Sequence, residues 1–225
     1  MRPYHQIPII ESGEPLVEIP LELFAVENPH PYAKLGAHYG QYSPYFLRKT
    51  VVKNLIHAQN YLNLLSPGWH IRIFDAYRPV GVQQFMVDYS FIQLVKARGI
   101  LEQNLSDDQR EKIWQQVYEI WAPPSSNPHT PPPHSTGAAV DITLVNERGE
   151  IINMGSPIDE ISERSHPDYY LNKHSQYHQG REMLNNIMCQ AGFQRHPREW
   201  WHFSFGDQMW AWLSHQSTAI YGFCE

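Results

Sequence analysis

Two side chains suited to metal binding, His134 and Asp141, lie close together in the sequence. Asp141 falls inside an otherwise apolar, strand-forming run, where aspartate is disfavoured and a buried carboxylate must be paired, hydrogen-bonded or bound to a metal. Because side chains alternate along a strand, the small Ala139 would share its face and leave room beside the carboxylate. Gly137 would permit a turn that brings His134 back over the start of the strand. Taken alone, the segment favours a solvated aspartate and an ordinary loop histidine over a metal site.

A second candidate group, Glu199 and His202, lies among tryptophans near the end of the sequence. Residues three apart in a flat strand face opposite sides of the sheet. The two side chains can therefore share a site only if the chain bends or if Glu199 precedes the regular strand. The alternative is an aromatic core with Glu199 at its rim.

Together the two groups fit a hydrolytic zinc site. Two histidines and one aspartate form a sufficient ligand set for zinc and leave a fourth position for water. A glutamate that does not bind the metal is then available as a general base. Arg78, where a strand is expected to end, could stabilise an oxyanion or bind a substrate carboxylate. Its alternatives are an ordinary surface arginine or one paired with Asp75.

In this order, the three blocks resemble the D-alanyl-D-alanine dipeptidases. These belong to a zinc D,D-peptidase family related to D,D-carboxypeptidases, phage endolysin peptidases and the hedgehog signalling domain. The matching blocks, within residues 70–205, are Tyr77-Arg78-Pro79, His134-x-x-Gly137-x-Ala139-x-Asp141 and Glu199-Trp200-Trp201-His202. A further block, Met154-Gly155-Ser156-Pro157-Ile158-Asp159 with Ser165-His166 after it, resembles one typical of the dipeptidase branch.

The resemblance implies a role for each matching residue. His134, Asp141 and His202 would bind one zinc ion per chain. Glu199 would be the general base, and Arg78 would stabilise the transition state. The implied reaction is hydrolysis of the dipeptide D-Ala-D-Ala by a metal-activated water.

Substrate contacts are also implied, with one departure from the family. Asp159 would lie near the amino group of the substrate, and Trp201 would form part of the pocket wall. The family usually has a serine two residues before its first histidine, where this chain has Pro132. Ser135 or Thr136 is then the candidate hydroxyl for binding the substrate carboxylate.

Two other functions are compatible with the same zinc ligands. One is a D,D-carboxypeptidase or peptidoglycan endopeptidase with an open cleft. The other is a non-enzymatic, zinc-stabilised binding module. The presence of Glu199 and Arg78 argues against the binding module, since a structural zinc needs neither.

Other histidines compete for the ligand role. His174 and His178 could grip a metal from one face of a helix, but no carboxylate at matching spacing supports them, so surface positions are expected. Surface positions are also expected for His129, His166 and His196, with hydrogen bonding near the site as the alternative.

Periodicity predicts the elements that would position these residues. Helices are expected from Ser43-Pro44 to about residue 65, over 82–95, from a capping box at Ser106 and over 175–191. Strands are expected over 70–78, 138–145 and 199–205. This order indicates an α+β fold, a single domain over residues 1–225 with a central antiparallel sheet flanked by helices. The resemblance implies a hedgehog/D,D-peptidase-like version of it. Residues 1–42 would form an irregular segment packed on the domain.

Composition limits the partners. The chain has 225 residues and a formal charge of −6, and the absence of a basic run argues against nucleic-acid binding. No run approaches the roughly 20 apolar residues of a membrane span. The first residues lack the apolar core of a secretory signal, which predicts a cytoplasmic protein whose partner is a small dipeptide. The sequence carries no signal of oligomeric state.

Overall fold

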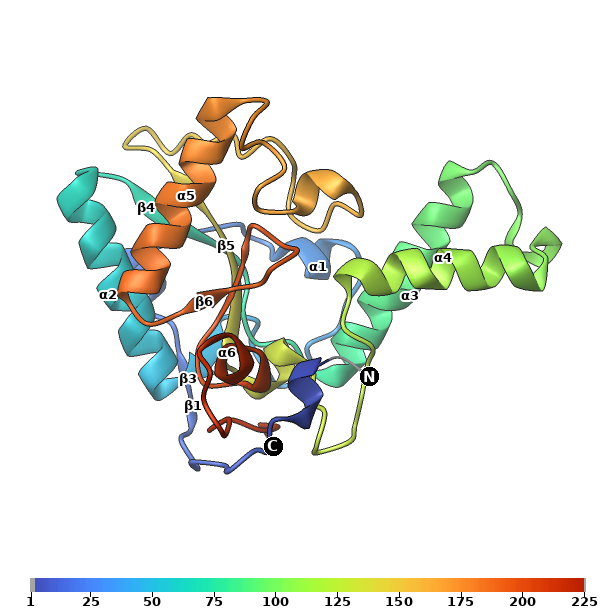
Figure 1. The fold of residues 1–225 in the computed structure, drawn as a ribbon, viewed down its shortest axis with the longest axis horizontal. Coiled ribbons are helices and arrows are strands. Elements are labelled where there is room, and N and C mark those ends of the chain that lie inside the picture. Colours follow the sequence, from blue (N-terminus) through green and yellow to red (C-terminus); the bar gives the residue numbers. More distant parts are fainter. Residues whose placement is uncertain (1–2, 225) are drawn as a thin grey trace.

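A five-stranded sheet crosses the centre of the computed structural model, which describes residues 3–224 (Figure 1). The strands lie in the order β2-β4-β5-β7-β6. Their bounds are β2 Ala25–Val26, β4 His70–Asp75, β5 Ala139–Val145, β7 His202–Ser204 and β6 Gln194–Arg195. All pairs are antiparallel except β2 with β4, which is parallel. The expected α+β fold with a mainly antiparallel sheet is confirmed, and the parallel edge strand was not predicted.

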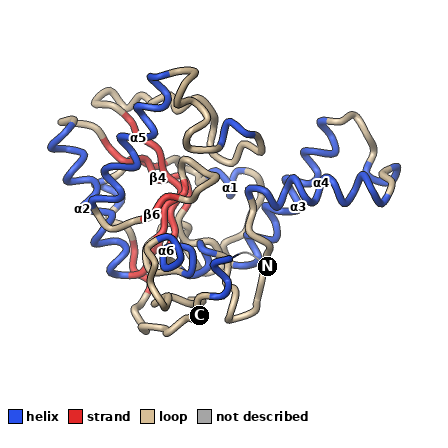
Figure 2. The backbone as a smooth tube through the Cα atoms, viewed as in Figure 1, coloured by secondary structure: helices blue, strands red, loops and turns tan. Residues whose placement is uncertain are grey.

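Two helices cover one face of the sheet. α2 (Lys49–Leu65) and α5 (Ser175–Gln190) pack against each other, and α2 also contacts β4. The contact follows from an apolar stripe along α2, where Val51, Leu55, Ala58 and Leu62 recur at helical spacing and are buried. Every residue of β5 is buried. Figure 2 shows that loops make up much of the molecule on the other side of the sheet.

A helical hairpin projects from the body of the molecule (Figure 1). It consists of α3 (Val80–Ala97) and α4 (Asp107–Ile120). The Phe91 and Trp114 rings stack between the two helices, with centroids 4.2 Å apart. Ser106 caps α4 in the expected capping box. α4 ends at Ile120, and the next residue, Trp121, lies near the side chains of Asp141 and His202 on the sheet.

Two regions differ from the expected elements. The helix expected from Ser43 begins only at Lys49, because Phe46–Arg48 forms a strand, β3, paired with β1 (Leu16–Glu18). The Ser43 hydroxyl instead accepts a hydrogen bond from the Tyr45 amide in a local turn. The strand expected over 199–205 is confined to β7. It is followed by a short helix, α6 (Gln208–Leu213), that was not predicted.

The remaining helical elements are short. They are α1 (Pro31–Lys34) and five 3-10 turns, namely η1 Pro3–Gln6, η2 Leu21–Leu23, η3 Glu102–Asn104, η4 Pro133–Thr136 and η5 Glu163–Ser165. Within residues 3–224, no helix combines the length and apolar character needed to span a membrane.

Candidate active site

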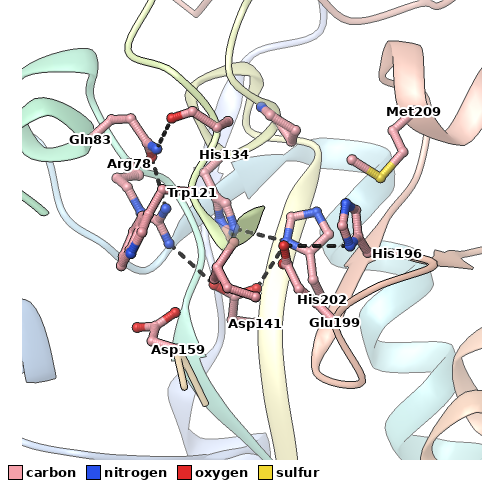
Figure 3. Close-up of a pocket in the computed structure, with 13 residues that line it drawn as sticks. Arg78, Gln83, Trp121, His134, Asp141, Asp159, His196, Glu199, His202 and Met209 are labelled. Atoms are coloured by element: carbon pink, nitrogen blue, oxygen red, sulfur yellow. Dashed lines mark hydrogen bonds and ion pairs between the residues drawn. The ribbon is translucent and has the colours of Figure 1, made fainter. Parts of the chain in front are cut away.

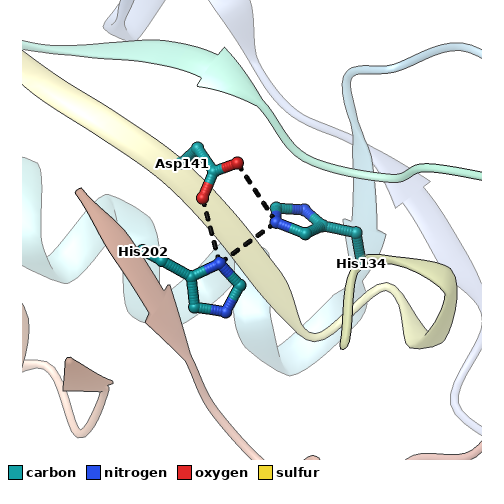
Figure 4. A group of neighbouring side chains, drawn as sticks. All are labelled: His134, Asp141 and His202. Atoms are coloured by element: carbon teal, nitrogen blue, oxygen red, sulfur yellow. Dashed lines mark hydrogen bonds and ion pairs between the residues drawn. The ribbon is translucent and has the colours of Figure 1, made fainter. Parts of the chain in front are cut away.

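Three acidic or imidazole side chains form a row across the middle of the sheet. Asp141 on β5 lies opposite His202 on β7 and opposite Asp75 on β4. Residues directly opposite in paired strands share a face of the sheet. His134 joins this row from η4, and Gly137 ends that turn in a left-handed conformation with φ +68°. The sheet and the turn thus bring together residues that are distant in sequence (Figure 4).

His134, Asp141 and His202 meet at hydrogen-bond distances. His134 Nε2 lies 3.2 Å from His202 Nδ1 and 3.2 Å from Asp141 Oδ2, and His202 Nδ1 lies 3.0 Å from Asp141 Oδ1. Ligands about 2.0–2.1 Å from a tetrahedral zinc ion stand roughly 3.3 Å apart. All three side chains are buried. Their nitrogen and oxygen atoms therefore fit a zinc ion without a large rearrangement.

Hydrogen bonding orients the imidazoles. The Nδ1–H of His134 donates to the Ala76 carbonyl at 2.7 Å, which leaves the Nε2 lone pair facing Asp141. Burial raises the pKa of Asp141, but the charges and hydrogen bonds of His134 and His202 bring it well below the ordinary value. Burial lowers the pKa of His202, yet its hydrogen bond to Asp141 raises the pKa overall. Asp141 is thus held as a carboxylate against the two imidazoles.

Arg78 follows β4 and extends its guanidinium along the row. Its Nε donates to Asp75 Oδ2 at 2.8 Å, its Nη1 to Gln83 Oε1 at 2.8 Å, and its Nη2 to Asp141 Oδ2 at 3.2 Å. The Tyr32 and Trp121 rings flank it, 5.0 and 4.9 Å from the guanidinium carbon. Arginine is suited to this position because its planar fork can satisfy several acceptors at once.

Asp75 is fully buried and holds Arg78 in place. Its Oδ1 also lies 3.1 Å from His30 Nε2 and accepts a hydrogen bond from the Tyr39 hydroxyl at 3.1 Å. Burial raises the pKa of Asp75, but the charge of Arg78 makes the net shift downward. The pairing with Asp75 that was the alternative to a catalytic Arg78 therefore exists, and it coexists with placement in the cavity.

Glu199 reaches the cluster from just before β7. Its Oε2 lies 3.8 Å from His202 Nδ1, and its Oε1 lies 3.4 Å from His196 Nδ1. Because the regular strand begins at His202, residues three apart can face the same site here. Glu199 therefore lies beside the three potential ligands.

Asp159 approaches from a loop on the other side of the cluster (Figure 3). It adopts a left-handed backbone conformation with φ +64°, which is strained for a residue other than glycine and is common at functional sites. Its Oδ2 accepts a hydrogen bond from the Tyr32 hydroxyl at 2.7 Å. Burial, and next the negative charge of Asp141, raise the pKa of Asp159 to about 7.

One cavity contains six of the eight predicted site residues. Its walls include Arg78, His134, Asp141, Asp159, Glu199 and His202. Ser135 does not line it, because its hydroxyl donates to the Arg78 carbonyl at 2.8 Å. Trp201 does not line it either. Its side chain is buried in the hydrophobic core instead.

Several cavity residues were not predicted from the sequence. Gln83 and Trp121 come from the ends of the helical hairpin. Tyr32, which does not line the cavity but hydrogen-bonds to Asp159, comes from the segment expected to be irregular. None of them belongs to a recognisable motif. His196 was expected at the surface but is buried in the cavity wall, 3.4 Å from Glu199. Its closeness to Glu199 in the sequence was the only available signal.

A second group of potential metal ligands lies outside the cavity. It consists of Asp168, His178 and Glu182, so the expectation that no carboxylate accompanies His178 was wrong. Asp168 is exposed, and Glu182 Oε1 is already paired with Arg195 Nη1 at 2.9 Å. This group is therefore less buried than the first, and one of its carboxylates is already held by an arginine.

Comparisons with known proteins agree with the family resemblance. The profile of the peptidase M15 family, described as D-ala-D-ala dipeptidase, matches residues 25–219. A D-alanyl-D-alanine dipeptidase of Synechocystis sp. is 50% identical over 241 residues, covering 100% of this chain and 98% of that protein. A D-alanyl-D-alanine dipeptidase of Escherichia coli is 35% identical over 136 residues, covering 60% of this chain and 55% of its own.

Among solved structures, the vancomycin resistance D,D-pentapeptidase VanY in complex with Zn(II) is similar to this chain. The sequences are 18% identical, the TM-score is 0.46, and the match covers 88% of this chain and 95% of the other.

Proposed function

The chain belongs to the D-ala-D-ala dipeptidase family, and we propose that it is a zinc peptidase that hydrolyses the dipeptide D-Ala-D-Ala. One observation carries the proposal. His134, Asp141 and His202 converge within 3.2 Å of one another in a buried cavity that also contains Glu199 and Arg78. A purely structural metal site requires neither a neighbouring carboxylate base nor a buried arginine.

The three converging residues would hold the metal, and Glu199 would move the proton. His134, Asp141 and His202 would hold the zinc ion, whose Lewis acidity would make a water molecule nucleophilic at neutral pH. Glu199, with its Oε2 3.8 Å from His202 Nδ1, accepts the proton of the attacking water. It then donates that proton to the nitrogen of the leaving amino acid as the peptide bond breaks.

Arg78 would stabilise the negative charge that develops on the carbonyl oxygen. Its guanidinium is fixed by Asp75 and Gln83 before substrate arrives, so no reorganisation is needed in the transition state. The Tyr32 and Trp121 rings, which flank the guanidinium, restrict its movement. Arg78 therefore acts as a preoriented positive charge.

Asp159 would bind the ammonium group of the substrate. A free dipeptide carries an ammonium at one end, and a carboxylate beside the cavity provides its counter-charge. Ion pairing with that ammonium would favour the ionised form of Asp159. Ser135 is left out of this proposal because its hydroxyl donates to the Arg78 carbonyl.

We propose further that the whole chain, residues 1–225, acts as one domain. Tyr32 from the N-terminal segment hydrogen-bonds to Asp159, so this segment supports a residue of the cavity wall. A cytoplasmic location stays a prediction.

The test is an assay of D-Ala release by the zinc-loaded protein. D-Ala-D-Ala is expected to be hydrolysed, hydrolysis should stop with a chelator, and added zinc should restore it. N-acetyl-D-Ala-D-Ala, which has no ammonium for Asp159, should be a poor substrate. Preference for the acetylated or a longer substrate would indicate a carboxypeptidase or endopeptidase. Absence of hydrolysis by metal-loaded protein would favour a binding module.

A further inference from the structure

A buried arginine outside the cavity contacts the loop that carries Asp159. Arg181 lies on α5, its side chain is fully buried at 0% exposure, and the proposed mechanism does not use it. The loop runs from Met154 to Pro167 and includes the block that resembles one typical of the dipeptidase branch.

The guanidinium of Arg181 donates to both ends of this loop. At the first end, its Nε donates to the Met154 carbonyl at 2.8 Å and its Nη2 to Ser156 Oγ at 3.2 Å. At the far end, its Nη1 donates to the His166 carbonyl at 2.7 Å and its Nη2 to the Arg164 carbonyl at 2.8 Å. The Arg181 side chain thus links the two ends of the loop by hydrogen bonds.

All these hydrogen-bond acceptors are neutral, and the Tyr170 ring lies 4.9 Å from the guanidinium carbon. Within residues 3–224, no carboxylate forms an ion pair with Arg181, and burial lowers its pKa to about 10. The group still carries its charge at neutral pH. Because an unpaired buried charge is costly, the loop carbonyls must stay where the guanidinium can reach them. The charge on Arg181 therefore opposes any other loop conformation.

The same loop is joined to the segment that carries Glu199. Ser156 Oγ accepts a second hydrogen bond from Trp200 Nε1 at 2.9 Å, and the Trp200 amide donates to the Ser165 carbonyl at 3.0 Å. The Trp200 ring also lies 5.3 Å from the Arg181 guanidinium carbon. The loop is therefore fixed between α5 and the residue that follows Glu199.

We propose that Arg181 is a positioning residue that holds Asp159 toward the cavity and so sets the affinity for the substrate ammonium. The proposal rests on the proposed function, in which Asp159 binds that ammonium. Asp159 is a short distance along the chain from Ser156, and its strained φ of +64° persists only if its surroundings fix it. Lysine cannot replace this arginine, since a single ammonium lacks the fork that reaches both ends of the loop.

The test compares Arg181→Lys with Arg195→Lys, using kcat and KM for D-Ala-D-Ala, zinc content and thermal unfolding. Arg195 on β6 is the matched control. It pairs with Glu182 of α5 and donates to the backbone carbonyl of Arg181, but it makes no hydrogen bond to the loop. Arg181→Lys is expected to raise KM about 10- to 100-fold, with kcat and zinc content nearly unchanged. Arg195→Lys should leave KM unchanged. A folded Arg181→Lys variant with the KM of the wild type overturns the proposal.

A double mutant separates positioning from general loosening. If Arg181 acts through Asp159, adding Arg181→Lys to Asp159→Asn should raise KM no further. A multiplicative rise in KM overturns the proposal. Should Arg181→Lys fail to fold, Ser156→Ala removes one of its acceptors without altering the buried charge. That variant must raise KM in the same way, and an unchanged KM counts against the role of Arg181. Failure of the wild type to cleave the dipeptide would instead reject the proposed function.

Discussion

At the scale of single residues, the charges in the cavity compensate one another. Arg78 lies between Asp75 and Asp141, and the two imidazoles of the cluster face the Asp141 carboxylate. Removing one partner of a buried ion pair commonly costs about 3–5 kcal/mol, because it leaves an uncompensated charge. Substitutions here must therefore be judged by folding and metal content as well as by rate.

Glu199→Gln should retain zinc and lose activity. The amide keeps the shape of the side chain but cannot accept the proton of the attacking water, so kcat should fall by about 10²–10⁴. Steady-state kinetics with zinc analysis of the same sample provides the check. An active Glu199→Gln variant would reject Glu199 as the general base.

Arg78→Lys should lower kcat by about 10²–10³. A lysine ammonium cannot satisfy Asp75, Gln83 and Asp141 together, so its charge would no longer be fixed toward the carbonyl oxygen. Arg72→Lys serves as the control, since Arg72 lies on β4, the strand that precedes Arg78, but pairs with Glu27 and does not line the cavity. A change confined to KM would mean that Arg78 binds the substrate carboxylate instead.

Asp159→Asn should stabilise the metal-free protein in a pH-dependent manner. The carboxyl has a pKa of about 7 in the fold and about 4 in the unfolded chain, so its ionisation destabilises the fold as pH rises through that window. Asparagine cannot ionise, so its advantage is largest above pH 7 and vanishes near pH 4. Thermal unfolding at pH 8 and pH 5 in chelator tests this, and a larger gain at pH 5 would contradict it.

At the scale of elements, the turn η4 determines where His134 lies. It ends at Gly137, whose φ of +68° brings the chain directly into β5. A Cβ at this position would overlap the Leu16 side chain of β1 and press on Cys224 Sγ at 3.2 Å. The small two-stranded sheet is therefore part of the support for a potential metal ligand.

Gly137→Ala should weaken both folding and zinc binding. The positive φ alone costs about 1–2 kcal/mol for a residue with a side chain, and the overlap with Leu16 adds to it. Gly149→Ala is a matched control, because Gly149 has φ +77° but open space around its Cβ. Thermal unfolding and zinc affinity should separate the two variants. Equal zinc affinity would mean that the turn does not position His134.

Elements with a strong local signal were predictable, and those defined by distant pairing were not. The Ser106 capping box located the start of α4 correctly, and periodicity located α5 to within one residue. In contrast, the short strand Phe46–Arg48 exists because it pairs with Leu16–Glu18, which no local pattern encodes. The row of Asp75, Asp141 and His202 likewise depends on strand register. The sequence resemblance anticipated two members of this row as ligands, whereas Asp75 was considered only as an alternative partner of Arg78 and not as part of the site.

At the scale of the whole molecule, both ends of the chain support the turn that carries His134. The buried Arg48 donates to the Thr136 carbonyl at 2.9 Å, and also to the Gly222 and Phe223 carbonyls at 3.2 and 3.3 Å. The Cys224 amide donates to the Ser135 carbonyl at 3.3 Å. Tyr32, from the N-terminal segment, donates a hydrogen bond to Asp159 of the cavity wall and accepts one from Arg78. Local patterns could not reveal these roles, because they arise only when the ends pack together.

The central claim is that one zinc ion is held by His134, Asp141 and His202. Zinc content per chain, measured for the wild type, His134→Ala and His178→Ala after equal loading, tests it most directly. His178 belongs to the second, partly exposed group and serves as the control. We expect about one zinc per chain in the wild type and in His178→Ala, and little in His134→Ala. Full zinc content in His134→Ala, or its loss in His178→Ala, would contradict the account.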